Sequence, residues 1–139
     1  MIPSSNHGWI VDASVALKWF LPPDDEPDGD LARKLTDHQV RVTSLTYYEV
    51  GNVLGRVPGS SPAYVDGCLA AMGRICDVGV ELNPSDYGLS VALAHTHGIT
   101  FYDASYVAIA KRLGRTVISA DRDLLGPGLA VDLKTATLA

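Results

Sequence analysis

ITFYDASYVAIAKRLGRTVISADRDL, residues 99–124, has the pattern of a helix followed by a short buried strand. The spacing of its apolar residues predicts a helix over 102–113, and Gly114 is typical of the residue that ends one. Residues 116–120 are mostly apolar, as in a strand of a parallel sheet. Asp121 follows this strand directly. The stretch therefore predicts a helix–strand unit with a carboxylate at the carboxyl end of the strand.

The same alternation of strand-like and helix-like segments extends along the rest of the chain. Strands are predicted over 9–12, 40–43, 80–82 and 116–120, with a last one at a sheet edge over 130–133. Helices are predicted over 13–20, 28–37, 46–57, 61–77, 83–97 and 102–113. Pro22-Pro23 and the acidic run Asp24-Asp25-Glu26 predict a solvated loop. This order favours an α/β fold in one domain of residues 1–139, with a central, mainly parallel sheet flanked by helices.

The composition is that of a globular protein. The chain has 139 residues, of which 47% are apolar and 19% charged, and this excludes a disordered protein. No apolar run approaches the ~20 residues of a membrane span, and the start MIPSSNHG lacks the features of a signal peptide. A cytoplasmic protein without a membrane partner is therefore expected. Cys68 and Cys76 lie about 12 Å apart along one predicted helix, so buried thiols are expected rather than a disulfide.

The charge balance limits how this protein could contact a nucleic acid. Lys and Arg number 11 against 16 Asp and Glu, which gives a net charge of −5 and excludes a general nucleic-acid coat. Any RNA contact must use a local basic patch or a bridging metal. The candidate patches are Lys111-Arg112 with Arg115, and Arg122 beside Asp121. Ordinary solvated charges are the alternative interpretation.

Four carboxylates lie where a predicted strand or loop meets a helix. They are Asp12, Glu49, Asp103 and Asp121. The carboxyl ends of parallel strands share one edge of a sheet, where ligands bind, so these acids are expected to converge and to repel one another. A cation would hold them together, and Mg²⁺ binds through carboxylates plus substrate phosphates. The pattern predicts a Mg²⁺ site, with Mn²⁺ as the alternative ion, and metal-assisted phosphodiester chemistry.

Each of these acids also has a purely structural interpretation. Asp12, Asp103 and Asp121 could each cap the helix that follows. Glu49 could close a capping box with Thr46, because the two are three residues apart. For any single acid, the sequence leaves open whether it caps a helix or belongs to a metal site. The presence of an acid at all four junctions favours a shared site.

Three segments resemble the PIN-domain ribonucleases, specifically the VapC-type toxins of toxin–antitoxin pairs. GWIVDASVALKWFLP resembles the opening of the family, a hydrophobic strand that ends in Asp12-Ala13-Ser14. TSLTYYEVGNVL resembles the second motif, with Glu49 in a helix and Asn52 one turn further on. ITFYDASYVAIAKRLGRTVISADRDL resembles the third and fourth motifs, with Asp103-Ala104 and Ser119-Ala120-Asp121 at matching positions. The resemblance covers nearly the whole chain in the right order.

This resemblance implies a fold, an activity and a set of residue roles. The fold would be a PIN-like three-layer sandwich, and the activity the hydrolysis of RNA at a carboxylate-bound metal. Asp12, Asp103 and Asp121 would be direct ligands, while Glu49 would bind the metal or hold the attacking water. The residues expected to support these ligands are Ser14, Asn52, Ser119 and Asp123, and the sequence leaves open whether Asp123 faces the metal or solvent.

The resemblance also implies protein partners. A cognate VapB-type antitoxin would block the site, and a homodimer is expected. We expect an amphipathic antitoxin helix to dock in a groove lined by part of one apolar set near the acids. The members of that set are Trp19, Phe20, Tyr47, Tyr48, Val53 and Val57.

Two other functions fit part of the pattern. A receiver-like signalling module also gathers acids at a sheet edge and binds Mg²⁺, but it would need a second acid after the first strand, where Ala13 stands. A PIN-like binding domain without catalytic activity is the other alternative, and the four intact acids argue against it.

Overall fold

A three-stranded parallel sheet lies at the centre of the computed structural model, which describes residues 8–21 and 28–138. The strand order is β2 (Val40–Arg41), β1 (Trp9–Val11), β3 (Thr116–Ile118). Trp9 pairs with Val40 on one side and with Thr116 on the other. Three of the five predicted strands are therefore present and parallel, although each is shorter than predicted.

The other two predicted strands are single bridges that extend the sheet on both sides. Val80 pairs in parallel with Thr43, beyond β2, and Val131 pairs in parallel with Ile118, beyond β3. The prediction of strands over 80–82 and 130–133 was wrong in extent, because each segment turns into a helix soon after its bridge. Pro84 opens a short 3₁₀ helix, and Asp132 accepts a hydrogen bond from the backbone N–H of Thr135 at 2.7 Å as α8 begins.

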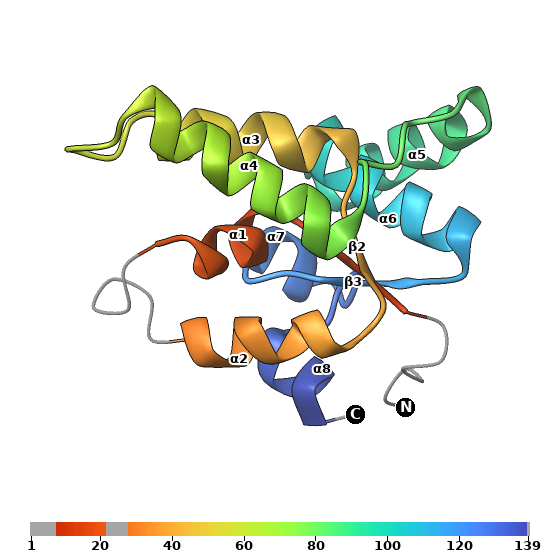
Figure 1. Ribbon diagram of the computed structural model, residues 1–139. Coiled ribbons are helices and arrows are strands. Elements are labelled where there is room, and N and C mark those ends of the chain that lie inside the picture. The colour runs from red at the N-terminus through yellow and green to blue at the C-terminus, as the bar shows by residue number, and fades with distance from the viewer. Residues whose placement is uncertain (1–7, 22–27, 139) are drawn as a thin grey trace.

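Helices cover both faces of this sheet. Figure 1 shows α3 and α4 side by side at the top of the view and α2 with α8 at the bottom. These four helices share one core cluster with the sheet, and α6 packs in a second cluster. The α-helices are α1 (Ala13–Ala16), α2 (Gly29–Lys34), α3 (Ser44–Leu54), α4 (Pro62–Cys76), α5 (Tyr87–His97), α6 (Phe101–Leu113), α7 (Arg122–Leu125) and α8 (Leu133–Leu138). Short 3₁₀ helices cover Leu17–Trp19, Leu35–Asp37 and Pro84–Asp86. The arrangement is the expected α/β sandwich; α8 was not predicted.

Capping residues set the ends of the longer helices. The Ser61 hydroxyl accepts a hydrogen bond from the Tyr64 N–H at 3.1 Å at the start of α4, where Pro62 needs no donor. Gly114 ends α6 in the left-handed conformation, as predicted. α3 begins at Ser44, two residues earlier than predicted, because Thr43 is its N-cap.

Alternating residues of the strands enter two separate parts of the core. Trp9, Val11 and Ile118 belong to a cluster that also contains buried residues of α3, α4 and α8. Ile10 and Val117 belong to a second cluster with α6. Both faces of the sheet are thus buried, which is why its strands are apolar without alternation.

Other expectations have a direct outcome in the described part of the chain. Cys68 and Cys76 are buried free thiols, as expected. Within residues 8–21 and 28–138, no helix combines the length and the apolar character that crossing a membrane requires. The acidic run 24–26 lies outside the described residues.

Candidate active site

The carboxyl edge of the sheet opens into a depression of about 610 Å³. Glu49 reaches it from α3, Asp103 from the first turn of α6, and Asp121 from the segment after β3. Its lining residues are Leu45, Tyr48, Glu49, Asn52, Thr100, Tyr102, Asp103, Asp121 and Asp123. Asp12 follows β1 but does not line the depression, because its side chain is buried.

Three of the acids form a compact group. Asp103, Asp121 and Asp123 each present one carboxylate oxygen, and these oxygens lie within 4.8 Å of one another. Asp121 Oδ1 accepts the Asp123 N–H at 2.9 Å, so the turn that begins α7 brings the two side chains to the same place. The orientation of Asp123, which the sequence left open, is therefore toward the other acids.

Two serine hydroxyls hold Asp12. Ser14 Oγ donates to Asp12 Oδ1, and Ser119 Oγ donates to Asp12 Oδ2. The same hydroxyls accept hydrogen bonds from the backbone just after β3. The Ala120 N–H donates to Ser14 Oγ and the Asp121 N–H donates to Ser119 Oγ, both at 2.9 Å. Burial raises the pKa of Asp12, while the bonds from Ser119 and Ser14 act in the opposite direction. Asp12 and its serines thus join the end of β1 to the end of β3 next to the acidic group.

Glu49 is held by a chain of buried hydroxyls. The Tyr106 hydroxyl donates to Glu49 Oε1 at 3.0 Å, and Thr46 Oγ1 donates to the Tyr106 oxygen at 3.2 Å. The Thr43 N–H in turn donates to Thr46 Oγ1 at 3.1 Å. Sequence reasoning gave Tyr106 no role, because a tyrosine in the middle of an apolar helix has the same pattern as an ordinary core residue.

The structural interpretation holds for two of the four acids. Asp12 and Asp121 do cap α1 and α7. Asp103 does not cap α6, because Thr100 Oγ1 accepts the Asp103 N–H at 3.0 Å. The alternative capping box between Thr46 and Glu49 is not formed: Thr43 and Thr46 form the box that begins α3. Asp103 and Glu49 are thus free of any capping role.

Negative charge at this edge has no cationic counterpart in the described structure. Within residues 8–21 and 28–138, no Lys or Arg forms an ion pair with any of the site acids. Burial, and then the charges of Asp121, Asp12 and Asp123, raise the pKa of Asp103 to about 6. Burial also raises the pKa of Glu49, and the charges of Asp103 and Asp121 act in the same direction. The hydrogen bond from Tyr106 acts to lower it. An all-oxygen donor set with unbalanced charge fits a hard divalent cation such as Mg²⁺.

The basic residues considered as candidate RNA contacts are separated in the fold. Arg112 is tied to Asp86 by an ion pair at 2.9 Å. Arg115 lies at the other end of the sheet, where its Nη1 donates to the Trp9 and Gln39 carbonyls at 3.2 Å each. Lys111 and Arg122 are exposed, and neither lines the acidic depression. The proposed Lys111-Arg112-Arg115 patch is therefore not a joint feature of the fold.

The six apolar residues expected near a partner groove are divided among different surroundings. Trp19, Phe20 and Tyr47 are partly buried and pack against the core. Tyr48 is 75% exposed and lines the acidic depression, and Val53 is 39% exposed. Val57 lines a separate depression with Leu21, Leu54 and Tyr64. The set as a whole does not line one groove, although Tyr48 lies beside the acids.

Comparison with known proteins identifies the family of this fold. The family model of the PIN domain matches residues 9–126. The chain belongs to the PIN-domain family. Two relatives come from Pyrobaculum aerophilum: ribonuclease VapC3 is 27% identical over 119 residues, 83% of this chain and 90% of the relative. Exonuclease VapC9 is 32% identical over 105 residues, 70% of this chain and 74% of the relative.

These relatives confirm the VapC-type resemblance seen in the sequence motifs. A solved toxin–antitoxin complex from Klebsiella pneumoniae has the same fold, with a TM-score of 0.72 at 16% identity. The alignment covers 91% of this chain and 98% of that one. The PIN-like α/β sandwich predicted from the sequence is thereby confirmed.

Proposed function

We propose that this VapC-type PIN domain is a Mg²⁺-dependent endoribonuclease and the toxin of a toxin–antitoxin pair. One observation carries the proposal: Asp103, Asp121 and Asp123 bring carboxylate oxygens within 4.8 Å of one another in an open depression, without a cation from the described chain. The names of the two VapC relatives support a nuclease. RNA is the proposed substrate, and the cytoplasm is the proposed location because RNA is available there.

The metal would be held by acids that line this depression together with Asp12 beside it. We assign Asp12, Asp103 and Asp121 as ligands, with Asp123 beside them and Glu49 either as a further ligand or as the residue that holds the attacking water. Each Asp12 oxygen accepts a bond from a serine hydroxyl, but a carboxylate offers about four lone-pair sites, so Asp12 keeps capacity for an ion. The same oxygen ligands would accept Mn²⁺.

The catalytic chemistry divides between the ion and the protein. When bound, Mg²⁺ would supply Lewis-acid polarisation of the phosphoryl oxygen and a lower pKa for the attacking water. Glu49 would orient that water and take its proton, and its raised pKa supports the role of a base. The Tyr106 hydroxyl fixes the position of the Glu49 carboxylate. Ser14 and Ser119 do the same for Asp12, as partners of ligands commonly do.

The alternative functions separate clearly. The chain is not a receiver-like module, because the family model of the PIN domain matches residues 9–126. A PIN domain without activity remains the competing proposal.

Cleavage assays decide between the active and inactive proposals. Purified protein is incubated with single-stranded RNA in Mg²⁺, in EDTA, and in EDTA followed by excess Mg²⁺, and cleavage is expected in the first and third conditions. A circular RNA substrate distinguishes endonuclease from exonuclease activity, which matters because one relative is named an exonuclease. No cleavage of any RNA in Mg²⁺ or Mn²⁺ would favour the inactive binding domain.

An antitoxin is the proposed protein partner, supported by the VapC-type resemblance. Tyr48 is 75% exposed beside the acids, so an amphipathic antitoxin helix that covers Tyr48 would also cover the depression. An Arg or Lys from the antitoxin would then neutralise the carboxylates in competition with Mg²⁺. The complex should lose nuclease activity, and Tyr48→Ala should weaken it. A tight complex that cleaves RNA at the full rate would rule out a site-blocking antitoxin.

A homodimer is part of the same proposal. Helix α5 exposes Tyr87, Leu89 and Val91, which are 50%, 36% and 58% exposed, and these apolar side chains support an interface on that helix. Light scattering on the purified toxin measures the mass directly. A monomer at micromolar concentrations would contradict the dimer without affecting the nuclease proposal.

A further inference from the structure

A second depression, of about 390 Å³, lies toward the amino ends of the strands, away from the acids. Its lining combines four basic side chains from separate parts of the chain: His38, Arg41, Arg74 and Arg115. Arg41 ends β2, Arg74 lies in the last turn of α4, and Arg115 immediately precedes β3. In a chain with 16 acids and only 11 Lys and Arg, three arginines thus gather in one hollow. Asp77 is the acid that lines it.

Arg115 is fixed in place by the backbone around it. Its Nη1 donates to two carbonyls, those of Trp9 and Gln39. Gly8 has a φ of +76°, which favours glycine, and a Cβ there would lie 2.6 Å from the same nitrogen, so a side chain at this position would displace the Arg115 guanidinium. Arg41 and Arg115 line the same depression, and burial together with the charge of Arg41 lowers the pKa of Arg115.

The positive charges of this hollow are not matched within the described part of the chain. In residues 8–21 and 28–138, none of the three arginines forms an ion pair with a carboxylate. Asp77 Oδ1 accepts the Val78 N–H at 2.9 Å. Arg41 Nε is buried and has no hydrogen-bond partner among the described atoms. The C-terminal carbonyls of α4 favour a nearby cation, but they account for neither the three arginines together nor the unpartnered Nε.

We propose that this basic depression binds a phosphate group. Guanidinium groups match phosphate oxygens because their donors form a planar fork, and several of them give charge-assisted hydrogen bonds to one phosphate. The phosphate can come from the backbone of RNA or from a free phosphorylated small molecule. The proposal stands apart from the nuclease activity, since it concerns different residues at a different part of the sheet.

Binding is measured in EDTA with inorganic phosphate as the probe, at constant ionic strength, by following backbone amide signals in NMR spectra. Without a metal the acidic site repels phosphate, so saturable shifts confined to Arg41, Arg74 and their neighbours are expected. Arg74→Glu should weaken binding by at least about tenfold. Lys111→Glu is the matched control, because it makes the same charge change at an exposed position on α6, outside the lining.

Arg41→Gln provides a second variant, and its thermal melt shows whether the fold is retained. Retained folding with lost phosphate binding supports the proposal. Absence of saturable shifts in the wild type overturns it, as does equal weakening by Arg74→Glu and Lys111→Glu, which would show a general charge effect.

Two further probes identify the source of the phosphate. A short 2′-O-methyl oligoribonucleotide that binds more tightly than phosphate, and whose salt slope falls by about 0.7 in Arg74→Glu, identifies RNA. Adenosine monophosphate that binds more tightly than the oligomer identifies a free nucleotide instead. Cleavage assays in Mg²⁺ test the nuclease separately, so failure of one proposal is distinguishable from failure of the other.

Discussion

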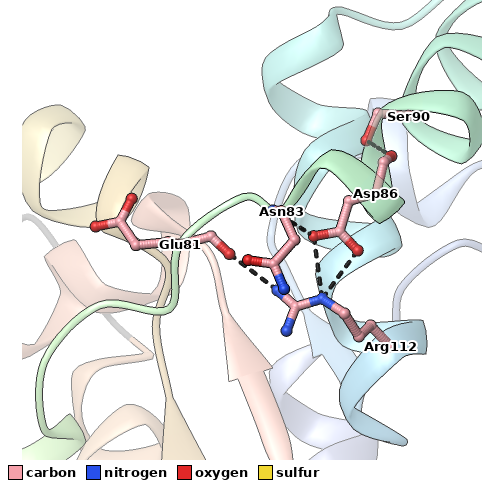
Figure 2. Close-up of polar contacts among 5 residues, drawn as sticks. All are labelled: Glu81, Asn83, Asp86, Ser90 and Arg112. Atoms are coloured by element: carbon pink, nitrogen blue, oxygen red, sulfur yellow. Dashed lines mark hydrogen bonds and ion pairs between the residues drawn. The ribbon is translucent and has the colours of Figure 1, made fainter.

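Two carboxylates at the starts of neighbouring helices meet opposite surroundings. Asp86 precedes α5 and is 3% exposed, and Arg112 Nε lies 2.9 and 3.1 Å from its two oxygens. Figure 2 shows the guanidinium of Arg112 held between the Asp86 carboxylate and the Glu81 carbonyl, with Asn83 donating its N–H to the same carboxylate. Asp103 lies in the first turn of α6, and its charged neighbours are other acids.

The pKa of these two carboxyl groups moves in opposite directions. Burial alone acts to raise both. For Asp86, the hydrogen bonds from Arg112 and Asn83 and the charge of Arg112 outweigh burial, and its pKa falls below 3.8. For Asp103, the neighbouring acids add to burial and raise the pKa to about 6. A charge that the chain itself neutralises joins two elements of the fold, whereas a cluster of unbalanced negative charges attracts a cation.

The largest effect should come from removing one charge of the unbalanced group. Asp103→Asn keeps the shape of the side chain but removes the charge that attracts the ion. RNA cleavage in Mg²⁺ should fall about 10³-fold or more, since a metal supplies several kcal/mol of transition-state stabilisation. The rate is measured with single-stranded RNA at saturating Mg²⁺.

The matched control is Asp66→Asn, which removes one carboxylate charge from an exposed position on α4. It should cleave at the wild-type rate. Circular dichroism should show both variants folded. Full activity of Asp103→Asn would remove Asp103 from the site.

Breaking the balanced pair should cost stability instead. Arg112→Met leaves the Asp86 carboxylate buried without its cation, and the free energy of unfolding should fall by about 3 kcal/mol at neutral pH. Urea denaturation measures it. Because the pKa of Asp86 is lowered in the folded state, the contribution is present above pH 3.8 and is lost as the pH falls through the folded value.

An exposed ion pair gives the control for this change. Arg33 contacts Asp30 at 3.0 Å, but the Asp30 side chain is 93% exposed, so Arg33→Met should change stability by less than about 0.5 kcal/mol. Cleavage per folded molecule should stay unchanged in Arg112→Met, because the pair lies outside the acidic depression. Equal losses of stability in the two variants would show that the Asp86–Arg112 pair contributes no more to the free energy of unfolding than an exposed ion pair.

Removing the Tyr106 hydroxyl should have an intermediate effect on activity. Tyr106→Phe frees the Glu49 carboxylate, and outer partners of catalytic groups are worth about 10- to 100-fold. The lost donor also favours protonated Glu49, so the acidic limb of the pH–rate profile should move to higher pH. Tyr87→Phe, a half-exposed tyrosine on α5, should change neither. A lower cleavage rate in Tyr106→Phe without a shift in the acidic limb of the pH–rate profile would indicate a packing effect alone.

The sequence predicted the order of elements because their signals are local. Ser61-Pro62 begins α4 and Gly114 ends α6, and both act on backbone groups only a few residues away. The apolar strands follow the same logic, since both faces of the sheet are buried. The single bridges at Val80 and Val131 were overestimated as strands, because where pairing stops depends on the next helix rather than on the residues that pair.

The convergence of acids was predicted from their positions where a strand or loop meets a helix, but their hydrogen-bond partners were not predicted. Whether Asp123 points inward depends on the Asp121 cap, and the role of Tyr106 depends on a hydrogen bond to a helix 57 residues earlier in the chain. Arg112 and Arg115 are close in sequence and diverge in space, while Arg115 joins Arg41 and Arg74. Contacts between distant segments set these groupings, and no local pattern encodes them.

The smallest effect sharpens the comparison between Asp103 and Asp86 most directly. In EDTA at pH 7, Asp103→Asn should melt higher than the wild type, because it removes one of several repelling charges. The difference corresponds to about 1 kcal/mol once solvent screening is included, or a few degrees in Tm. Mg²⁺ should then stabilise the wild type more than the variant, since the wild type binds the ion better.

The pH dependence of this difference tests its cause. The folded pKa of Asp103, about 6, lies above the unfolded value of 3.8, so folding disfavours the ionised form. The penalty is complete above pH 6, shrinks as the pH falls between these two values, and is absent below 3.8. The melting difference between wild type and Asp103→Asn in EDTA should follow this course, opposite in sign to the pH dependence from Asp86. A difference that stays constant from pH 7 to pH 4 would show that asparagine stabilises by packing, and charge repulsion at the acidic edge would be the wrong explanation.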